Sequence, residues 1–264
     1  MIKALFFDID GTLVSFKTHQ IPLSTLQALE EARQRGIYIF ISTGRPKILI
    51  TVLGEMEKRG LIDGYITMNG AYCFVDDKVV NKQTIAPAQV EYLMTYCQQR
   101  DIPCMVVGEH DICVCQPNDL YEDFFYRRLT VGVDIPVRTT EDVLQEGKDV
   151  LQLTAFITPT QEAELSHKAN GVEYGRWNPA FADITPKGVT KHQGIDVFCK
   201  HFGLQLEETM AFGDGGNDIP MLRHAGIGVA MGNAVEEAKA VADYVTTDVD
   251  AEGVAQALKH FGVI

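Results

Sequence analysis

Residues 3–12 read Lys-Ala-Leu-Phe-Phe-Asp-Ile-Asp-Gly-Thr, an apolar run that ends in a pair of carboxylates. A short and continuously apolar run is typical of a strand that is buried in a parallel sheet. Side chains alternate along a strand, so Asp8 and Asp10 point the same way at its carboxyl end. Open parallel sheets bind ligands at that edge. The stretch therefore predicts the first strand of a parallel sheet and a polar site where that strand ends.

Helix and strand patterns alternate outward from this stretch. A helix is predicted from Ser24, which can cap it, to about Arg35, and an apolar strand is predicted over 37–41. The alternation returns near the other end, with helices expected over 187–202, 217–224, 234–240 and 251–261, and strands over 209–212 and 226–230. This order favours a doubly wound parallel α/β sheet with right-handed crossovers.

The regular alternation of helix and strand patterns stops in the middle of the chain. Two hairpins are predicted there, one joining 72–75 to 79–82 and the other joining 104–107 to 112–115. Further elements are expected as helices over 87–100 and near 161–169, and as strands over 151–157 and 172–177. We therefore expect a core formed by residues 1–82 and 186–264, with an inserted α+β domain of residues 83–185.

The composition excludes several classes of protein. The chain has 264 residues, 46% of them hydrophobic, and a formal charge of −13, which is typical of a globular protein with an acidic surface. Nucleic acids and acidic membrane surfaces are disfavoured as partners, because both attract positive charge. No stretch approaches 18 apolar residues, so no membrane span is expected. The six cysteines are scattered without CxxC pairs, which predicts free thiols in a reducing cytoplasm.

Asp8 and Asp10 are the strongest candidates for chemistry. Two carboxylates held close together repel one another unless a cation lies between them or one of them is protonated. The pair therefore indicates a metal site or a carboxyl group with a raised pKa. For this motif alone, a turn in which both residues cap the backbone around Gly11 is an equally good interpretation.

Three further segments strengthen the functional interpretation. Thr43 follows the second predicted strand, where its hydroxyl could bind a phosphate oxygen, although an ordinary loop threonine fits as well. Residues 213–218 read Gly-Asp-Gly-Gly-Asn-Asp, which brings carboxylates to another strand end, or else forms a glycine-rich turn with capping side chains. Lys187 opens a predicted helix, where it could balance clustered carboxylates or remain a solvated surface charge.

Together these segments resemble the four motifs of the haloacid dehalogenase superfamily of phosphohydrolases, in order and over nearly the whole chain. The inserted domain resembles the type IIB cap of that superfamily. Met68-Asn69-Gly70-Ala71 and Val229-Ala230-Met231-Gly232-Asn233-Ala234 resemble the Cof-type subgroup. The resemblance implies a Rossmann-like core with a mobile cap that closes over the carboxyl ends of the strands.

The resemblance also implies a role for each site residue. Asp8 would attack phosphorus to form an aspartyl-phosphate, and Asp10 would serve as general acid and then as general base. Mg²⁺ would be held by Asp8, by the backbone carbonyl of Asp10 and by Asp214, with Asp218 in a supporting position. The transferring phosphoryl group would be bound by Thr43, Gly44, Lys187 and Asn217.

Arg45 is a weaker candidate, because a guanidinium at this position could reach a phosphate or form a surface ion pair. Arg176 and Trp177, near the return to the core, could contact substrate but are more often core or rim residues. The histidines form no metal-binding pattern.

The function expected from this resemblance is Mg²⁺-dependent hydrolysis of small phosphomonoesters, such as sugar phosphates. The expected partner is a small phosphorylated metabolite, and we expect a cytoplasmic monomer or small homo-oligomer. A phosphomutase resembling phosphomannomutase would share the Asp8 and Asp10 chemistry. A non-catalytic phosphate-binding or metal-binding module is a further alternative, although it would not need Asp10.

Overall fold

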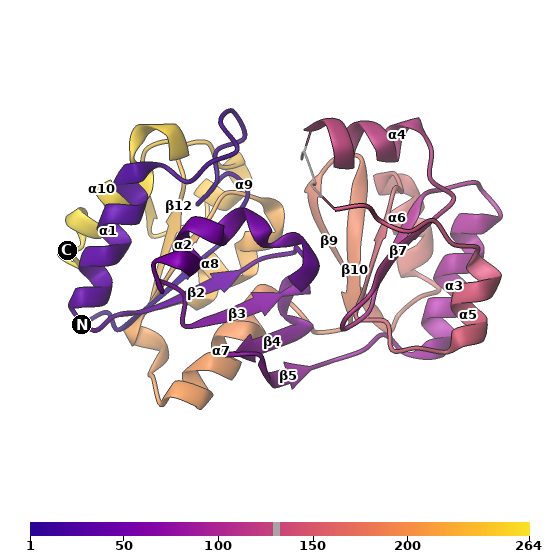
Figure 1. Ribbon diagram of the computed structural model, residues 1–264, viewed down its shortest axis with the longest axis horizontal. Helices are drawn as coiled ribbons and strands as arrows, with labels where there is room; N and C mark the ends of the chain where they lie inside the picture. Colours follow the sequence, from indigo (N-terminus) through magenta and orange to yellow (C-terminus); the bar gives the residue numbers. More distant parts are fainter. Residues whose placement is uncertain (129–132) are drawn as a thin grey trace. The chain divides into compact units, whose positions relative to one another are not determined.

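The computed structural model describes residues 1–128 and 133–264, including every side chain of these residues except Arg128 and Trp177. The chain forms two compact units (Figure 1). The first comprises Met1–Arg45, Ile50–Asn81 and Thr190–Ile264, and the second comprises Pro46–Leu49 and Lys82–Val189.

The first unit is built on an eight-stranded sheet with strand order β13-β12-β11-β1-β2-β3-β4-β5. Neighbours from β13 to β3 run parallel, whereas β4 is antiparallel to β3. The predicted doubly wound α/β core is confirmed by this sheet. The strands are β1 (Ala4–Phe7), β2 (Tyr38–Ser42), β3 (Gly64–Thr67), β4 (Tyr72–Val75), β5 (Lys78–Lys82), β11 (Thr209–Gly213), β12 (Ile227–Ala230) and β13 (Tyr244–Val245).

Strand β1 lies between β11 and β2, and its four residues are fully buried. Ala4 and Phe6 face one layer, where they belong to the same buried cluster as Ile195 and Phe198 of helix α7 (Lys191–Phe202). The alternate residues face the other layer, so both faces of the strand require apolar side chains. This burial explains why the run before Asp8 is continuously apolar.

Six helices of the first unit cover this sheet. Helices α1 and α10 lie side by side (Figure 1), and α7 packs against α8. The helices are α1 (Leu23–Gln34), α2 (Gly54–Lys58), α7 (Lys191–Phe202), α8 (Ile219–His224), α9 (Glu236–Lys239) and α10 (Gly253–His260). No described helix of the chain is both long enough and apolar enough to cross a membrane.

The predicted cap of α1 and the predicted start of α7 are wrong. The residue before α1 is Pro22, and no side chain caps the helix, because Ser24 already lies inside its first turn. Helix α7 begins at Lys191, four residues later than predicted. The preceding residues form a turn in which Val189 donates its N–H to the carbonyl of Pro186 and Gly188 adopts a φ of 79°.

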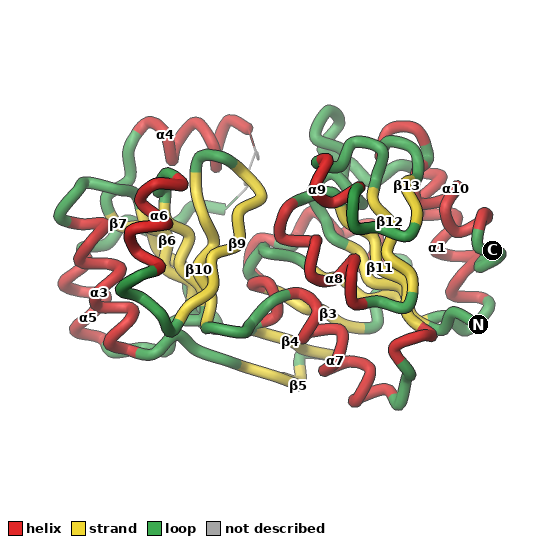
Figure 2. Tube along the Cα trace, turned by 180° about the vertical axis from the view of Figure 1, so that it is seen from behind, coloured by secondary structure: helices red, strands yellow, loops and turns green. Residues whose placement is uncertain are grey.

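The second unit contains a five-stranded antiparallel sheet with order β7-β6-β8-β10-β9. Helices α3 and α5 pack together, as Figure 2 shows. The elements are the strands β6 (Cys104–Val107), β7 (Ile112–Cys115), β8 (Gln152–Ala155), β9 (Val172–Asn178) and β10 (Phe181–Pro186), and the helices α3 (Pro87–Gln98), α4 (Asp119–Glu122), α5 (Thr140–Glu146) and α6 (Pro159–Ser166).

The hairpin of β6 and β7 is confirmed at the predicted residues, whereas strand β10 was not predicted. In β10 the polar residues Asp183 and Thr185 are buried beside apolar ones. Thr154 of the neighbouring strand donates a 2.7 Å hydrogen bond to Asp183. The polar pattern of β10 therefore reflects a satisfied buried pair rather than an exposed loop.

Candidate active site

The predicted site residues of the first unit lie where its parallel strands end. Asp8 follows β1, Thr43 follows β2, and Asp214 follows β11. These strands are neighbours in the sheet and run in the same direction, so their carboxyl ends share one edge. The sheet therefore gathers three separate sequence motifs at a single place, as expected for an open parallel sheet.

Asp8, Asp214 and Asp218 form a compact carboxylate cluster. One oxygen from each lies within 4.8 Å of the others. Burial raises the pKa of Asp8 to about 7, with Asp218 and Asp10 adding to the rise while Lys191 opposes it. Burial also raises the pKa of Asp214 to about 9, with further contributions from Asp8 and Asp218. Acids placed this way resist simultaneous ionisation unless a cation joins them.

The donor set of this cluster fits Mg²⁺. All three side chains offer carboxylate oxygens, the hard ligands that this ion prefers. The backbone at Gly11 passes very close to the cluster: a Cβ on that residue would lie 2.2 Å from Asp214 Oδ2. Thr12 donates a 3.2 Å hydrogen bond to the other oxygen of Asp214. Because Gly11 has no side chain, the carboxylate of Asp214 fits against the backbone at this point and lies close to Asp8.

The lysine of the cluster is Lys191, which corrects the prediction of Lys187. Lys191 Nζ is fully buried and donates to Asp8 Oδ1 at 2.5 Å and to Asp218 Oδ1 at 2.6 Å. Lys187 is exposed in the turn before α7. Because the helix begins at Lys191, its first residue reaches the strand ends. The signal that could have located it is Thr190, a residue type favoured at the position before a helix.

Asp218 holds the loop that carries Asp214. Its Oδ2 accepts backbone N–H groups of Asp214 and Gly215, both at 2.9 Å, while its Oδ1 binds Lys191. A Cβ at Gly213 would lie 2.5 Å from the Asp218 Cβ, so glycine is needed for this fold of the loop. Asp218 therefore fixes the backbone next to Asp214 in addition to offering an oxygen to the cluster.

Asp10 is held by Arg45. The guanidinium donates from Nε to Asp10 Oδ2 and from Nη2 to Asp10 Oδ1, both at 2.7 Å. The two side chains are only 13–14% exposed, so this is a desolvated, bidentate pair rather than a surface one. Of the two roles considered for Arg45, the structure shows an ion pair. Its partner is the residue expected to act as acid and base.

Thr43, Gly44 and Asn217 lie around the same edge. Thr43 is buried, and its hydroxyl accepts the N–H of Arg45 at 3.1 Å, while Gly44 is buried beside it. Asn217 Nδ2 donates to Asn69 Oδ1 at 3.1 Å. The sequence identifies Asn69 only as part of a subgroup motif and does not predict its contact with Asn217.

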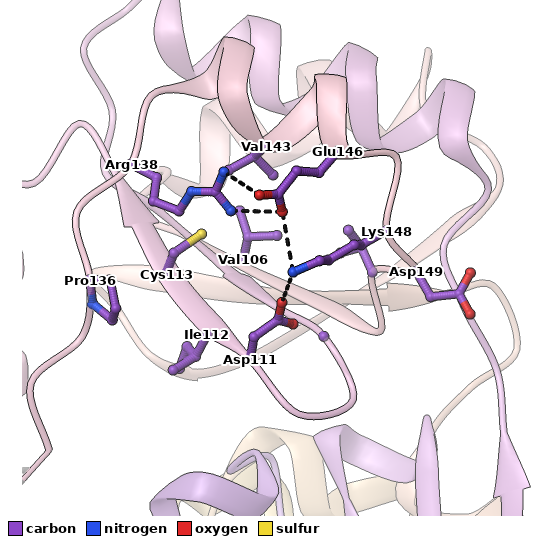
Figure 3. Close-up of a pocket in the computed structure, with 12 residues that line it drawn as sticks. Val106, Asp111, Ile112, Cys113, Pro136, Arg138, Val143, Glu146, Lys148 and Asp149 are labelled. Atoms are coloured by element: carbon purple, nitrogen blue, oxygen red, sulfur yellow. Dashed lines mark hydrogen bonds and ion pairs between the residues drawn. The ribbon is translucent and has the colours of Figure 1, made fainter.

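A hollow of about 250 Å³ lies within the second unit, and none of the predicted site residues lines it (Figure 3). Arg138 binds Glu146 with two 2.8 Å hydrogen bonds. Lys148 lies 2.8 Å from Asp111 and 3.3 Å from Glu146. Carboxylates thus neutralise both of these cations, and the hollow is a poor match for a phosphate dianion.

The weaker candidates in the second unit have structural partners or are not described. Arg176 donates to Glu162 Oε2 at 2.7 and 3.0 Å and to three backbone carbonyls, so it joins the turn between β9 and β10 to α6. The side chain of Trp177 lies outside the described residues.

Comparison with known proteins gives consistent results. The family model described as haloacid dehalogenase-like hydrolase matches residues 5–258. The putative phosphatase YkrA of Bacillus subtilis (strain 168) is 32% identical over 266 residues, covering 99% of this chain and 98% of the relative. A solved structure described as the HAD subclass IIB sugar phosphatase BT4131 is 56% identical, with a TM-score of 0.96 over 99% of this chain and 100% of that chain. The phosphatase BT1666 from Bacteroides thetaiotaomicron is 37% identical, with a TM-score of 0.87 over 100% of this chain and 96% of that chain.

Proposed function

We propose a function on the premise that this chain belongs to the haloacid dehalogenase-like hydrolases, whose family model spans residues 5–258. The predicted superfamily and its subclass IIB are confirmed, and the chain is a phosphoric monoester hydrolase. We propose that it uses Mg²⁺ and an aspartyl-phosphate to hydrolyse small phosphomonoesters, with sugar phosphates as the substrate class.

One observation carries this proposal: the cluster of Asp8, Asp214 and Asp218 with the buried Lys191 at the carboxyl edge of the sheet. A nucleophilic carboxylate next to a phosphate dianion needs positive charge to hold the two together. Lys191 supplies one such charge. In our proposal, Asp8, Asp214 and the backbone carbonyl of Asp10 would hold Mg²⁺, which would neutralise phosphate charge and polarise the phosphorus.

The proposed chemistry proceeds in two half-reactions at Asp8. In the first, a carboxylate oxygen of Asp8 forms a bond to phosphorus, the bond to the leaving alcohol breaks, and Asp10 gives that alcohol its proton. In the second, water attacks phosphorus, Asp10 takes the proton of the water, and the bond between Asp8 and phosphorus breaks. During these steps Arg45 would hold Asp10 through one carboxylate oxygen, while the other oxygen releases its bond to Arg45 and carries the transferred proton. Thr43 and Asn217 would donate to the phosphoryl oxygens.

Sugar phosphates are proposed because of the relatives. BT4131 is described as a sugar phosphatase and is 56% identical over nearly the full length. A more distant relative, 26% identical, is the 5-amino-6-(5-phospho-D-ribitylamino)uracil phosphatase YcsE of Bacillus subtilis, whose named substrate is also a phosphorylated polyol derivative. Both names favour small phosphorylated metabolites with several hydroxyl groups.

The inserted segment and the cellular location are also proposals. We assign residues 83–185 as the type IIB cap that selects the substrate. All six cysteines are buried and free, which supports a reducing cytoplasm as the working environment.

The test is a phosphatase screen over hexose and pentose phosphates, nucleotides and phosphoserine, with MgCl₂ or with EDTA. We expect the highest kcat/KM with sugar phosphates and no turnover in EDTA.

The Asp8→Asn variant should be inactive, whereas the control Asp101→Asn, an isosteric change at an exposed aspartate, should retain full activity. Isomerised sugar phosphate without free phosphate would indicate a mutase, and near-normal activity of Asp8→Asn would exclude the covalent mechanism.

A further inference from the structure

The turn after β3 has an unusual backbone. Met68, Asn69 and Gly70 have φ angles of 50°, 53° and 107°, three left-handed residues in succession. Left-handed backbone is unfavourable for a residue with a Cβ, although asparagine tolerates it better than most. Such a segment persists only where its surroundings hold it in place.

The residues that follow β2 hold this turn in place. Asn69 donates its N–H to the carbonyl of Thr43 at 3.0 Å, and Met68 donates to the carbonyl of Arg45 at 3.2 Å. Both acceptors belong to the segment that carries the expected phosphate-binding hydroxyl and the partner of Asp10. The strained turn is therefore fastened to that segment by two backbone hydrogen bonds.

The side chain of Asn69 extends the connection to a third loop. Asn69 is 6% exposed, and its Oδ1 accepts from Asn217 Nδ2 at 3.1 Å. An amide nitrogen carries two hydrogens. The contact with Asn69 uses one of them and fixes the rotation of the Asn217 amide, so the second N–H has a defined direction and can donate to a phosphoryl oxygen.

We propose that Asn69 is a positioning residue of the active site, which orients the Asn217 amide and keeps it in register with the segment of Thr43 and Arg45. It does not touch the substrate. This inference rests on the proposed function, in which Asn217 and Thr43 bind the phosphoryl group. It also gives the left-handed turn a role, because in that turn the side chain of Asn69, at φ 53°, meets Asn217.

Asn69→Gly separates this role from a purely structural one. Glycine adopts a φ of 53° without strain and removes the side-chain acceptor for Asn217. We expect the melting temperature to be unchanged, the KM for a sugar phosphate to rise about tenfold, and kcat to change less than KM. Asp101→Gly is the matched control, since Asp101 also has a left-handed φ of 52° but is exposed in the second unit.

A double-mutant cycle shows whether Asn69 acts through Asn217. We expect Asn217→Ala alone to raise KM at least as much as Asn69→Gly, and the double variant to differ from Asn217→Ala by less than twofold. Multiplicative effects of the two changes would overturn the inference. So would an Asn69→Gly enzyme whose KM stays within twofold of the unmodified protein.

Binding of inorganic phosphate with Mg²⁺, measured by calorimetry, gives a readout that does not require turnover. We expect Asn69→Gly to bind phosphate about tenfold more weakly. If the unmodified protein hydrolysed no phosphomonoester but this difference in affinity remained, the proposed function would fail and the positioning role of Asn69 would stand. Equal affinities in the two proteins would overturn the positioning role.

Discussion

Replacing Lys191 by methionine removes the positive charge from the carboxylate cluster while keeping most of the side-chain volume. Lys191 is fully buried and binds Asp8 and Asp218 at 2.5 and 2.6 Å, so its loss leaves buried carboxylates without their cation. Removing one partner from a buried ion pair costs about 3–5 kcal/mol. For a chain of 264 residues this corresponds to a fall of roughly 5–9 °C in melting temperature.

The control is Lys187→Met, which changes an exposed lysine that lies four residues earlier. Surface changes of this kind usually stay within about 0.5 kcal/mol. The two variants should be compared by thermal unfolding in EDTA at pH 8 and by kcat/KM with Mg²⁺. We expect Lys191→Met to melt early and to lose at least about 100-fold in kcat/KM, the loss typical of one removed electrostatic donor. Normal stability and activity in Lys191→Met, or a large loss in Lys187→Met, would refute the assignment.

Three further predictions follow from the same geometry. The pKa of Asp8 is raised to about 7 and that of Asp214 to about 9, so these two groups bind more protons in the folded state than in the unfolded one; without metal, stability should fall as pH rises from 4 to 9, and Mg²⁺ should reduce this fall in melting curves. Gly11→Ala places a Cβ 2.2 Å from Asp214 and should abolish activity, whereas Gly36→Ala, which has a similar φ and open space around it, should cost only stability; equal activities would contradict the close approach. Arg45→Ala should lower kcat about 10- to 100-fold in steady-state assays, because Asp10 loses the guanidinium group that fixes its orientation. An unchanged kcat would show that the ion pair between Arg45 and Asp10 is not needed for turnover.

The parallel core could be predicted because its signals are local. An apolar run followed directly by Asp8 identifies both a buried strand and its functional end, and the same holds for the glycine-rich segment around Asp214. The partner of Asp8 could not be identified in this way, because the choice between Lys187 and Lys191 depends on where α7 begins. That point is set by the turn around Gly188, which shifts the helix start by a full turn.

Contacts between loops were the other features that the sequence did not reveal. The sequence leaves Arg45 with two interpretations, a phosphate contact or a surface ion pair, since either a phosphate or a carboxylate satisfies a guanidinium. It does not identify Asp10 as the partner. The contact between Asn69 and Asn217 joins residues 148 positions apart, and no periodic pattern encodes it. The sequence does not predict strand β10, because a buried Asp183 breaks the apolar pattern that predicts strands.

The central claim is that Asp8 is the nucleophile and that Asp10 completes turnover. The most direct measurement uses Asp10→Asn with an aryl phosphate, whose leaving group departs without help from an acid. Our account predicts a burst of about one equivalent of phenol and, after an acid quench, a phosphoryl group on Asp8 by peptide mass spectrometry. A burst without phosphoryl-Asp8, or a phosphoryl group on another residue, would contradict it.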